Sequence, residues 1–272
     1  MEVNQAIEES HIQHQNEKEF LNYTAANLSR DAYQQNRVGH GNFRYVAELS
    51  DRHNAVYVND TTKQGFLTIR GTAADVEDAK ADALIVVGME NSSNRFKSAE
   101  NTLLRAQKQF GDITFFATGH SLGGRIAIEL GRKYRKGIEH VYAFNPGSSL
   151  PHFARSLYEH LNPYARNYGL STKVTINHIV GDPLSTLSVG EAKDTRVRET
   201  SKPSFGLSQH GIKHFTDKKA LNQQKTWGKY LLGKGALYAK KMIAKKLNIN
   251  PQYQSKIEQA VRKGIKKRIG RK

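Results

Sequence analysis

The chain has 272 residues, 38% of them hydrophobic and 25% charged, which is typical of a globular protein that buries a sizeable core. It contains no cysteine, and this excludes disulfides, thiolate nucleophiles and cysteine-based zinc sites. Its N-terminus lacks the apolar segment of a signal peptide, and no run of about 18 apolar residues predicts a transmembrane helix. We therefore expect an intracellular or particle-associated protein, either free or peripheral to a membrane.

The net charge of +17 is unevenly distributed along the chain. Residues 225–272 hold 15 Lys and Arg and one acid, Glu258, so they carry +14 and the rest of the chain only +3. This division predicts three parts. An N-terminal helical segment over 1–50 packs on a catalytic domain over 51–226, and a basic amphipathic tail follows over 227–272.

The predicted elements alternate between strand and helix from residue 55 onward. Short runs rich in aromatic and β-branched residues predict strands over 55–58, 66–69, 112–118, 141–144 and 173–180. Helical spacing of apolar residues or helix-forming composition predicts helices over 2–36, 73–83, 98–110, 122–134 and 153–161, and a polar loop is predicted over 184–209. This order is typical of an α/β fold in which helices cover both faces of a mostly parallel central sheet.

A candidate nucleophile lies between the strand over 112–118 and the helix over 122–134. The residues there read Gly119-His120-Ser121-Leu122-Gly123, a G-x-S-x-G pattern. A serine on such a strained turn projects its Oγ above the sheet, and the amide of Leu122, at a helix N-terminus, can stabilise an oxyanion. The alternative is a glycine-rich turn with an incidental serine. We predict that Ser121 is the nucleophile.

A serine nucleophile needs a histidine base and an acid that orients it, in the chain order Ser, acid, His. Asp182 fits the acid, because it follows the strand over 173–180 at the carboxyl end, where α/β sheets place their chemistry. Glu191 and Asp194, in the polar loop, are weaker candidates. A turn-forming role for Asp182 before Pro183 is the alternative.

Two histidines follow that acid, His210 and His214. We favour His210, because it lies at the end of a loop, whereas His214 would fall inside the next helix. A second oxyanion donor is predicted at Thr72, which follows the strand over 66–69 and can offer its amide at the level of the serine. Thr72 also suits an ordinary helix N-cap.

Five separated motifs resemble those of the class 3 (fungal-type) lipases of the α/β-hydrolase superfamily. They are Arg70-Gly71-Thr72 followed by Asp78 and Asp82, Thr118–Gly124, Asn145-Pro146-Gly147, Gly181-Asp182-Pro183, and His210. The resemblance covers roughly residues 55–225. It implies an α/β-hydrolase fold and hydrolysis of acylglycerol or phospholipid esters.

The resemblance also implies roles for individual residues. Ser121, Asp182 and His210 would form the catalytic triad, and Leu122 and Thr72 the oxyanion hole. Arg70 would be structural and pair with Asp78 or Asp82. Secreted members of the family carry signal peptides and disulfides, and this chain has neither.

The basic tail interleaves apolar clusters with lysine pairs, and Pro251 divides it into two predicted helices. Such helices bind anionic membranes, and the competing interpretations are nucleic-acid binding and a solvated tail without a partner. The predicted substrate is a lipid ester, and no metal or cofactor is predicted. A second hypothesis is a basic membrane- or nucleic-acid-interacting protein, such as a viral particle component, whose hydrolase body is inert. The oligomeric state stays open.

Overall fold

The computed structural model describes most of the predicted catalytic domain and the segment before it. The described residues are 2–72, 90–148, 173–182, 185, 192, 194–198, 206–217 and 225–226. The helices predicted over 73–83 and 153–161 lie outside them, and so does the basic tail. No helix in the described part of the chain is both long and apolar enough to cross a bilayer.

Within the described residues, nine strands form one sheet and lie in it in the order of the sequence. They are β1 (Gly39–His40), β2 (Phe43–Val46), β3 (Asn54–Asn59), β4 (Gln64–Ile69), β5 (Thr114–His120), β6 (Val141–Phe144), β7 (Val174–Ile179), β8 (Asp194–Arg198) and β9 (Lys225–Thr226). Strands β4 to β8 are parallel, whereas the pairs at both edges are antiparallel. The prediction of an α/β fold with a parallel centre is confirmed.

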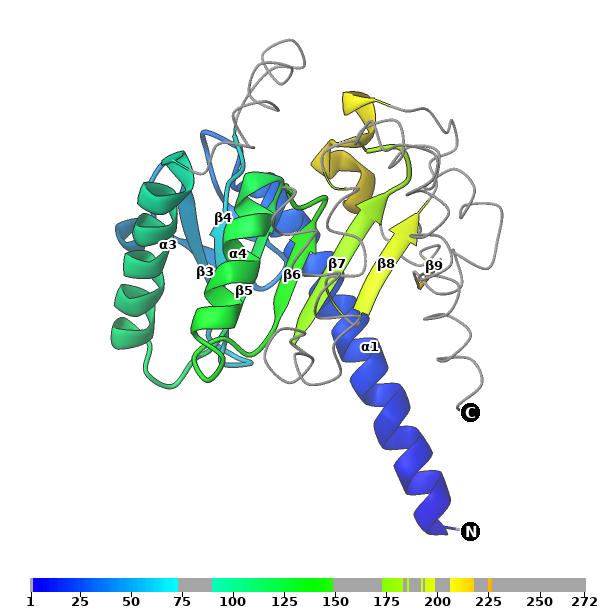
Figure 1. The fold of residues 1–272 in the computed structure, drawn as a ribbon. Coiled ribbons are helices and arrows are strands. Elements are labelled where there is room, and N and C mark those ends of the chain that lie inside the picture. Colours follow the sequence, from blue (N-terminus) through cyan, green and yellow to red (C-terminus); the bar gives the residue numbers. More distant parts are fainter. Residues whose placement is uncertain are drawn as a thin grey trace.

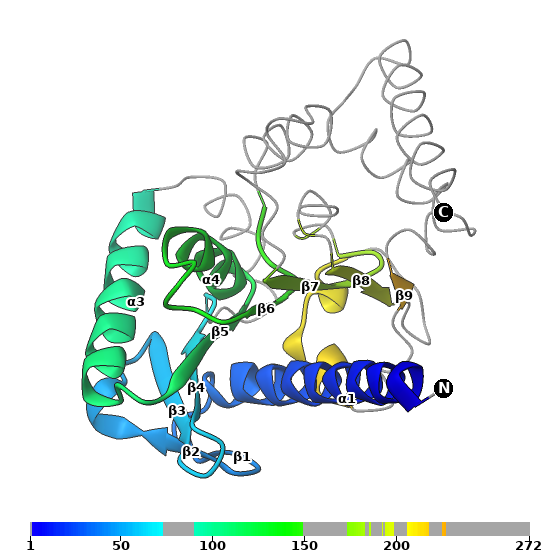
Figure 2. The same ribbon diagram turned by 90° about the horizontal axis from the view of Figure 1, so that it is seen from below.

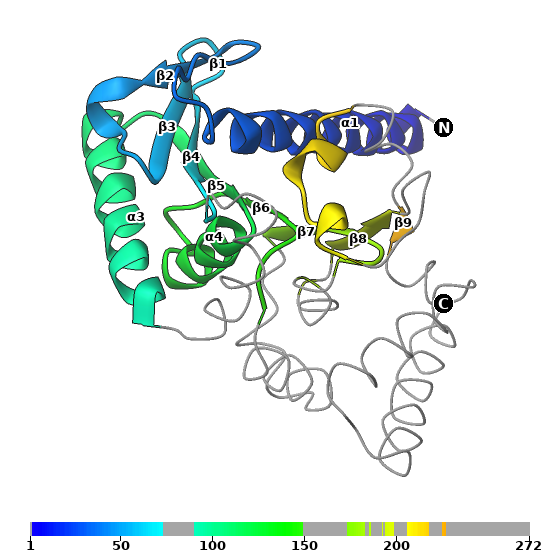
Figure 3. The ribbon, with the colours of Figure 1, turned by 90° about the horizontal axis from the view of Figure 1, so that it is seen from above.

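Three long helices cover the two faces of this sheet. Helix α3 (Glu90–Gln109) precedes β5, and α4 (Leu122–Lys133) connects β5 to β6. Strands that advance in one direction with right-handed crossovers place their helices on one face, and α3 and α4 do lie together (Figure 2). Helix α1 (Glu2–Asp31) covers the opposite face, and its N-terminal half extends beyond the sheet (Figures 1 and 3). Without α1, that face would be exposed to water.

Alternation of side chains along the central strands builds one hydrophobic core on each face. On β5, Phe115 and Ala117 pack in the core under α3 and α4, while Phe116 packs under α1. On β6, Ala143 faces the first core and Tyr142 the second. The α1 core is rich in aromatic rings, whereas the other core is mostly aliphatic. The near-continuous apolar runs in the sequence follow from this burial on both faces.

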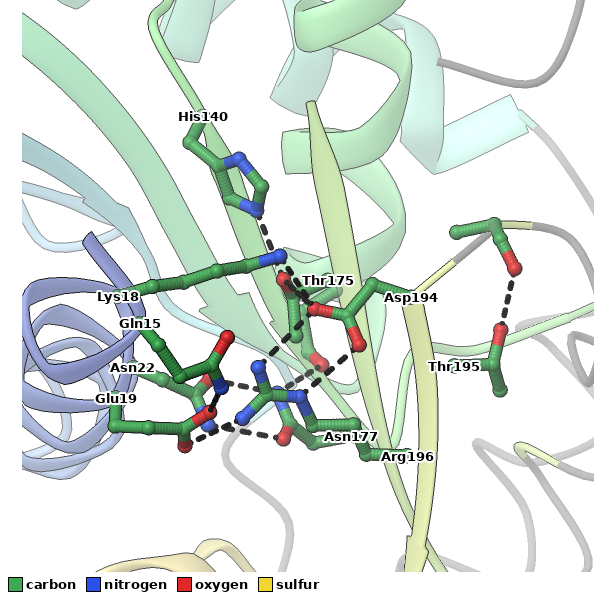
Figure 4. A network of polar contacts seen from close by, with 12 residues as sticks. Gln15, Lys18, Glu19, Asn22, His140, Thr175, Asn177, Asp194, Thr195 and Arg196 are labelled. Carbon is green, nitrogen blue, oxygen red and sulfur yellow. Dashed lines mark hydrogen bonds and ion pairs between the residues drawn. The ribbon is translucent and has the colours of Figure 1, made fainter. Parts of the chain in front are cut away.

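A buried group of polar side chains also fixes α1 to the sheet (Figure 4). We call it the anchor network, and it consists of Lys18, Glu19, Asn22, His140, Thr175, Asn177, Asp194 and Arg196. Arg196 is 8% exposed and donates to both oxygens of Asp194 at 3.1 Å and to Glu19 at 2.7 Å. Lys18 contacts Asp194 at 2.8 Å. The network joins the middle of α1 to strands β6, β7 and β8.

The structure differs from the predicted elements at several places, among them strand β9, which was not predicted, and α3, which begins at Glu90 rather than at residue 98. The first helix ends at Asp31 rather than at residue 36, because the Asp31 carboxylate accepts hydrogen bonds from the Gly39 amide at 3.1 Å and the Tyr57 hydroxyl at 2.8 Å. Strands β1 and β2 were not predicted. Strand β8 lies inside the segment predicted as a polar loop, and its polar side chains are satisfied by the anchor network.

Candidate active site

Ser121 lies on the sharp turn between β5 and α4. Its backbone has φ 59° and ψ −128°, a conformation that non-glycine residues rarely adopt and that costs energy to hold. The turn is fixed from both sides. The Ser121 amide donates to the Phe144 carbonyl at 3.1 Å, and the Ser121 carbonyl accepts from Gly147 at 3.0 Å. Such strain at a polar residue is a common feature of catalytic turns.

The glycines around Ser121 are required by the close packing of backbone at this turn. A Cβ on Gly119 would lie 2.5 Å from the Gly123 backbone, and one on Gly123 would lie 1.9 Å from the Ile69 carbonyl oxygen. Real Cβ atoms do not approach so closely, so neither position accepts a side chain without movement of strand or helix. The spacing of glycines in the sequence thus reflects the close backbone packing of β4, β5 and α4 at this turn.

Asp182 and His210 are brought together at the carboxyl end of β7. Asp182 is 1% exposed, and its Oδ2 lies 2.9 Å from Nδ1 of His210. A carboxylate in this position accepts a hydrogen bond from Nδ1–H, which leaves Nε2 of the neutral ring as the acceptor. That Nε2 is buried and has no partner among the described residues. An imidazole in this state is ready to take a proton from a hydroxyl.

Asn145 holds the loop that carries His210. Its Nδ2 donates to the carbonyls of Gln209 and His210, both at 3.0 Å, and its Oδ1 accepts from the Ile179 amide at 2.9 Å. The side chain is fully buried and its φ is +40°. Asn145 therefore ties the histidine loop to the ends of β6 and β7.

His120 contacts the same loop from the residue next to Ser121. Its Nε2 lies 2.5 Å from the His210 carbonyl oxygen, and the two imidazole centroids are 4.8 Å apart. Since His120 and Ser121 are consecutive, this contact places the His210 ring beside the serine turn. The three predicted triad residues thus lie at one end of the parallel strands.

The loop that carries the predicted oxyanion donor lies against Ser121. A Cβ on Gly71 would be 3.0 Å from Ser121 Cβ and 2.6 Å from the His120 carbonyl oxygen. Thr72 follows Gly71 and is exposed, and Leu122 is the first residue of α4. Thr72 therefore lies on a loop that packs against Ser121, and Leu122 follows Ser121 directly in the chain.

The alternative candidates lie elsewhere. Asp194 is in the anchor network, where Arg196 and Lys18 neutralise it. His214 Nε2 contacts the Ser208 carbonyl at 2.9 Å, and Glu191 lies outside the described residues. Asp78 and Asp82 also lie outside them, while the Arg70 guanidinium lies 5.2 Å from the centre of the Tyr33 ring. Within the described ranges, no group of three or more His, Asp or Glu residues could hold a metal ion.

Three residues at this site had no role in the sequence prediction: Tyr33, His120 and Asn145. His120 occupies a variable position of the G-x-S-x-G pattern, and Asn145 lies in the predicted turn Asn145-Pro146-Gly147. Because both residues lie within motifs that the sequence shows, the sequence already pointed to their positions near the site. Tyr33 comes from the turn that follows the N-terminal helix, far away in sequence, and no local pattern singles it out.

Comparisons with known proteins give matches only among solved structures, since no family model and no curated protein matches the chain. The non-glycosylated LIP2 lipase of Yarrowia lipolytica is 17% identical over 68% of this chain and 81% of that one, with a TM-score of 0.46. The triacylglyceride lipase of Rhizomucor miehei is 16% identical over 69% and 81%, with a TM-score of 0.42. These solved structures, to which the chain is similar, are lipases of fungi.

Proposed function

We propose that this protein is a serine hydrolase that cleaves carboxylic esters of lipids, either acylglycerols or phospholipids. The observation that carries the proposal is the Asp182–His210 pair, whose free Nε2 lies in a loop fixed to the residue before Ser121. A base with an unsatisfied nitrogen beside a serine on a strained turn is the arrangement that activates a hydroxyl.

The reaction follows from these positions. His210 Nε2 takes the proton of Ser121 Oγ as the oxygen bonds to the ester carbonyl carbon, and the carbonyl oxygen becomes an oxyanion held by the Leu122 and Thr72 amides. Asp182 keeps the proton of His210 on Nδ1 and stabilises the imidazolium. His210 then donates its Nε2 proton to the departing alcohol, leaving an acyl-serine. Water then attacks this ester while His210 takes its proton, and His210 returns the proton to Ser121 Oγ as the acyl–oxygen bond breaks and the acid is released.

The lipid nature of the substrate is supported by the sequence motifs around the site. Arg70-Gly71-Thr72, Thr118–Gly124 and Gly181-Asp182-Pro183 together resemble the motifs of class 3 lipases. The net charge of +14 over residues 225–272 further favours an anionic lipid surface as the place of action. We expect the chain to bind vesicles containing phosphatidylserine more tightly than duplex DNA at matched salt.

The proposed function is tested by replacing the nucleophile. Ser121→Ala removes Oγ alone, so we expect loss of p-nitrophenyl ester hydrolysis with an unchanged circular dichroism spectrum. Ser208→Ala, at an exposed serine two residues before His210, is the matched control and should keep wild-type activity. Wild-type activity in Ser121→Ala would overturn the proposal.

Labelling by a fluorophosphonate separates the enzyme from an inert body with a basic tail. Only an activated serine reacts with this probe, so wild type should label and Ser121→Ala should not. If folded wild-type protein did not label, the result would favour the second hypothesis, a basic membrane- or nucleic-acid-interacting protein whose hydrolase body is inert. Profiling triacylglycerols against phospholipids then assigns the headgroup preference.

A further inference from the structure

A row of hydrogen bonds links three segments around the candidate site. The Gly71 amide donates to the Tyr33 hydroxyl at 3.1 Å, and that hydroxyl lies 3.0 Å from Nδ1 of His120. Nε2 of His120 lies 2.5 Å from the His210 carbonyl oxygen. The row therefore connects the oxyanion loop, the serine turn and the loop of the base, and its first side chain, Tyr33, comes from the turn that follows α1.

The partners fix the direction of each hydrogen bond. A carbonyl oxygen only accepts, so Nε2 of His120 must carry a proton and donate it to His210. The Tyr33 hydroxyl accepts from the Gly71 amide, so its own proton is directed to Nδ1 of His120. His120 is thus a neutral imidazole protonated on Nε2, with both nitrogens used.

Electrostatics favours the same neutral state. Burial, together with the nearby His210, lowers the pKa of His120 to about 3, and burial raises the pKa of Tyr33 to about 12. Neither group therefore changes its charge near neutral pH. A neutral row has fixed donors and acceptors, and it adds no charge beside the base.

We propose that His120 and Tyr33 are positioning residues that set His210 and the Gly71–Thr72 loop in register around Ser121. This role rests on the proposed ester hydrolysis. Asn145 holds the His210 carbonyl from the β6 side, and His120 holds the same oxygen from the serine turn. The second contact fixes the loop relative to the nucleophile itself, so its loss displaces the base from Oγ.

Two replacements of His120 separate its two contacts. His120→Gln keeps an amide donor near the position of Nε2, whereas His120→Asn keeps only an acceptor near the position of Nδ1. We expect His120→Asn to lower kcat for a short soluble ester by about 10- to 100-fold with KM nearly unchanged, because small misplacements of a base have effects of this size. His120→Gln should recover most of that loss. Tyr33→Phe should lower kcat less than His120→Asn does.

Ser29→Ala is the matched control for a structural effect. Ser29 lies on α1 close to Tyr33 in the sequence, and its hydroxyl contacts the Thr118 hydroxyl at 3.0 Å in the same interface with β5. It should lower the thermal midpoint without selective loss of kcat. Equal kcat losses in Ser29→Ala and His120→Asn at equal stability would overturn the proposal, and so would equal activity of His120→Asn and His120→Gln.

Histidine NMR tests the row independently of turnover. Long-range ¹H–¹⁵N spectra of wild-type protein should show a histidine that stays protonated on Nε2 alone down to about pH 5. This signal should be absent in His120→Asn and shifted in Tyr33→Phe, whereas a similar signal from the buried His140 should remain unchanged in both variants. If wild type neither hydrolyses esters nor reacts with fluorophosphonate, the proposed function fails while this signal still tests the geometry. A His120 that titrates near pH 6.5 would overturn the row itself.

Discussion

The anchor network and the candidate site are two buried polar regions of the same sheet, and they differ in how completely they are paired. In the anchor network, two cations face two carboxylates, and Asn22 and Asn177 exchange amide hydrogen bonds at 3.0 and 3.2 Å (Figure 4). In the candidate site, Tyr33 and His120 are neutral, and Nε2 of His210 has no partner among the described residues.

This difference separates structural from chemical use of buried polar groups. A satisfied network gains nothing from a ligand, and breaking it costs stability. A buried nitrogen without a partner costs stability in the resting protein, and that cost is recovered when a proton or substrate arrives. We therefore expect replacements in the anchor network to change stability without changing kcat, and replacements at the site to do the reverse.

The largest expected effect comes from Asp182→Asn. An amide in place of the carboxylate directs the wrong tautomer of His210, so kcat for ester hydrolysis should fall by about 1,000- to 10,000-fold. Asp194→Asn makes the same chemical change in the anchor network and is the control, with kcat near wild type and a lower thermal midpoint. If both variants lost activity equally, the two regions would not be functionally distinct.

The next effect is on stability and comes from Arg196→Met. Removing the guanidinium leaves the mostly buried carboxylate of Asp194 with Lys18 alone, and breaking a buried pair in this way costs about 3–5 kcal/mol. Because Asp194 keeps its contact with Lys18, we expect a loss near the lower end of this range. Glu19 also loses its cation, but its side chain is 33% exposed, so water compensates most of that loss. Urea unfolding at pH 7 measures the free energy of unfolding, and a kcat per folded molecule equal to wild type is expected alongside it. Unchanged stability would contradict the anchoring role.

The same two regions show which features the sequence could reveal. The turn around Ser121 was predictable because its strand, glycines and helix are all local, and the glycine contacts follow from the spacing. Asp182 and His210 were predictable as candidates from the order of triad residues along the chain. Their pairing rather than that of Asp194 or His214 depends on the place of β8 in the sheet, which no local pattern gives.

Contacts between distant segments were not predictable. Strand β8 looks like a loop because its alternate residues are charged. Asp194 of the same strand pairs with Arg196, but a further partner, Glu19, comes from α1, about 180 residues earlier. Tyr33 reaches His120 for the same reason. Such contacts depend on which face of the sheet α1 covers, and that becomes defined only when α3 and α4 occupy the other face.

Lowering the pH should destabilise both regions of the protein. Burial lowers the pKa of His120 to about 3 and that of His140 to about 4, while unfolded histidines titrate near 6.5. The unfolded chain therefore binds more protons below pH 6.5, so stability falls as pH drops from about 6.5 to 4, by up to about 1.4 kcal/mol per pH unit for each histidine. Urea unfolding at a series of pH values measures this slope.

A second acid loss involves the anchor network through Asp194. Burial by itself would raise the pKa of Asp194, but Arg196 and Lys18 together lower it to about 2. A lowered carboxylate pKa gives stability that is present above pH 4 and lost as pH falls toward 2. His140→Gln should reduce the pH dependence of stability between pH 6.5 and 4, where His120 still contributes, and leave the loss below pH 4 unchanged. Stability independent of pH from 6.5 to 4 would contradict the neutral histidines.

The smallest effect is expected at the rim of the anchor network. The Lys18 side chain is 34% exposed, so water and salt screen its 2.8 Å contact with Asp194, and an exposed pair contributes about 1 kcal/mol or less. Lys18→Ala should therefore lower the free energy of unfolding by about 1 kcal/mol or less, with a smaller loss at high salt and unchanged kcat. A loss as large as that of Arg196→Met would mean that Lys18 neutralises Asp194 as a buried charge does. The network would then act as one unit, since neither cation alone would keep the carboxylate paired.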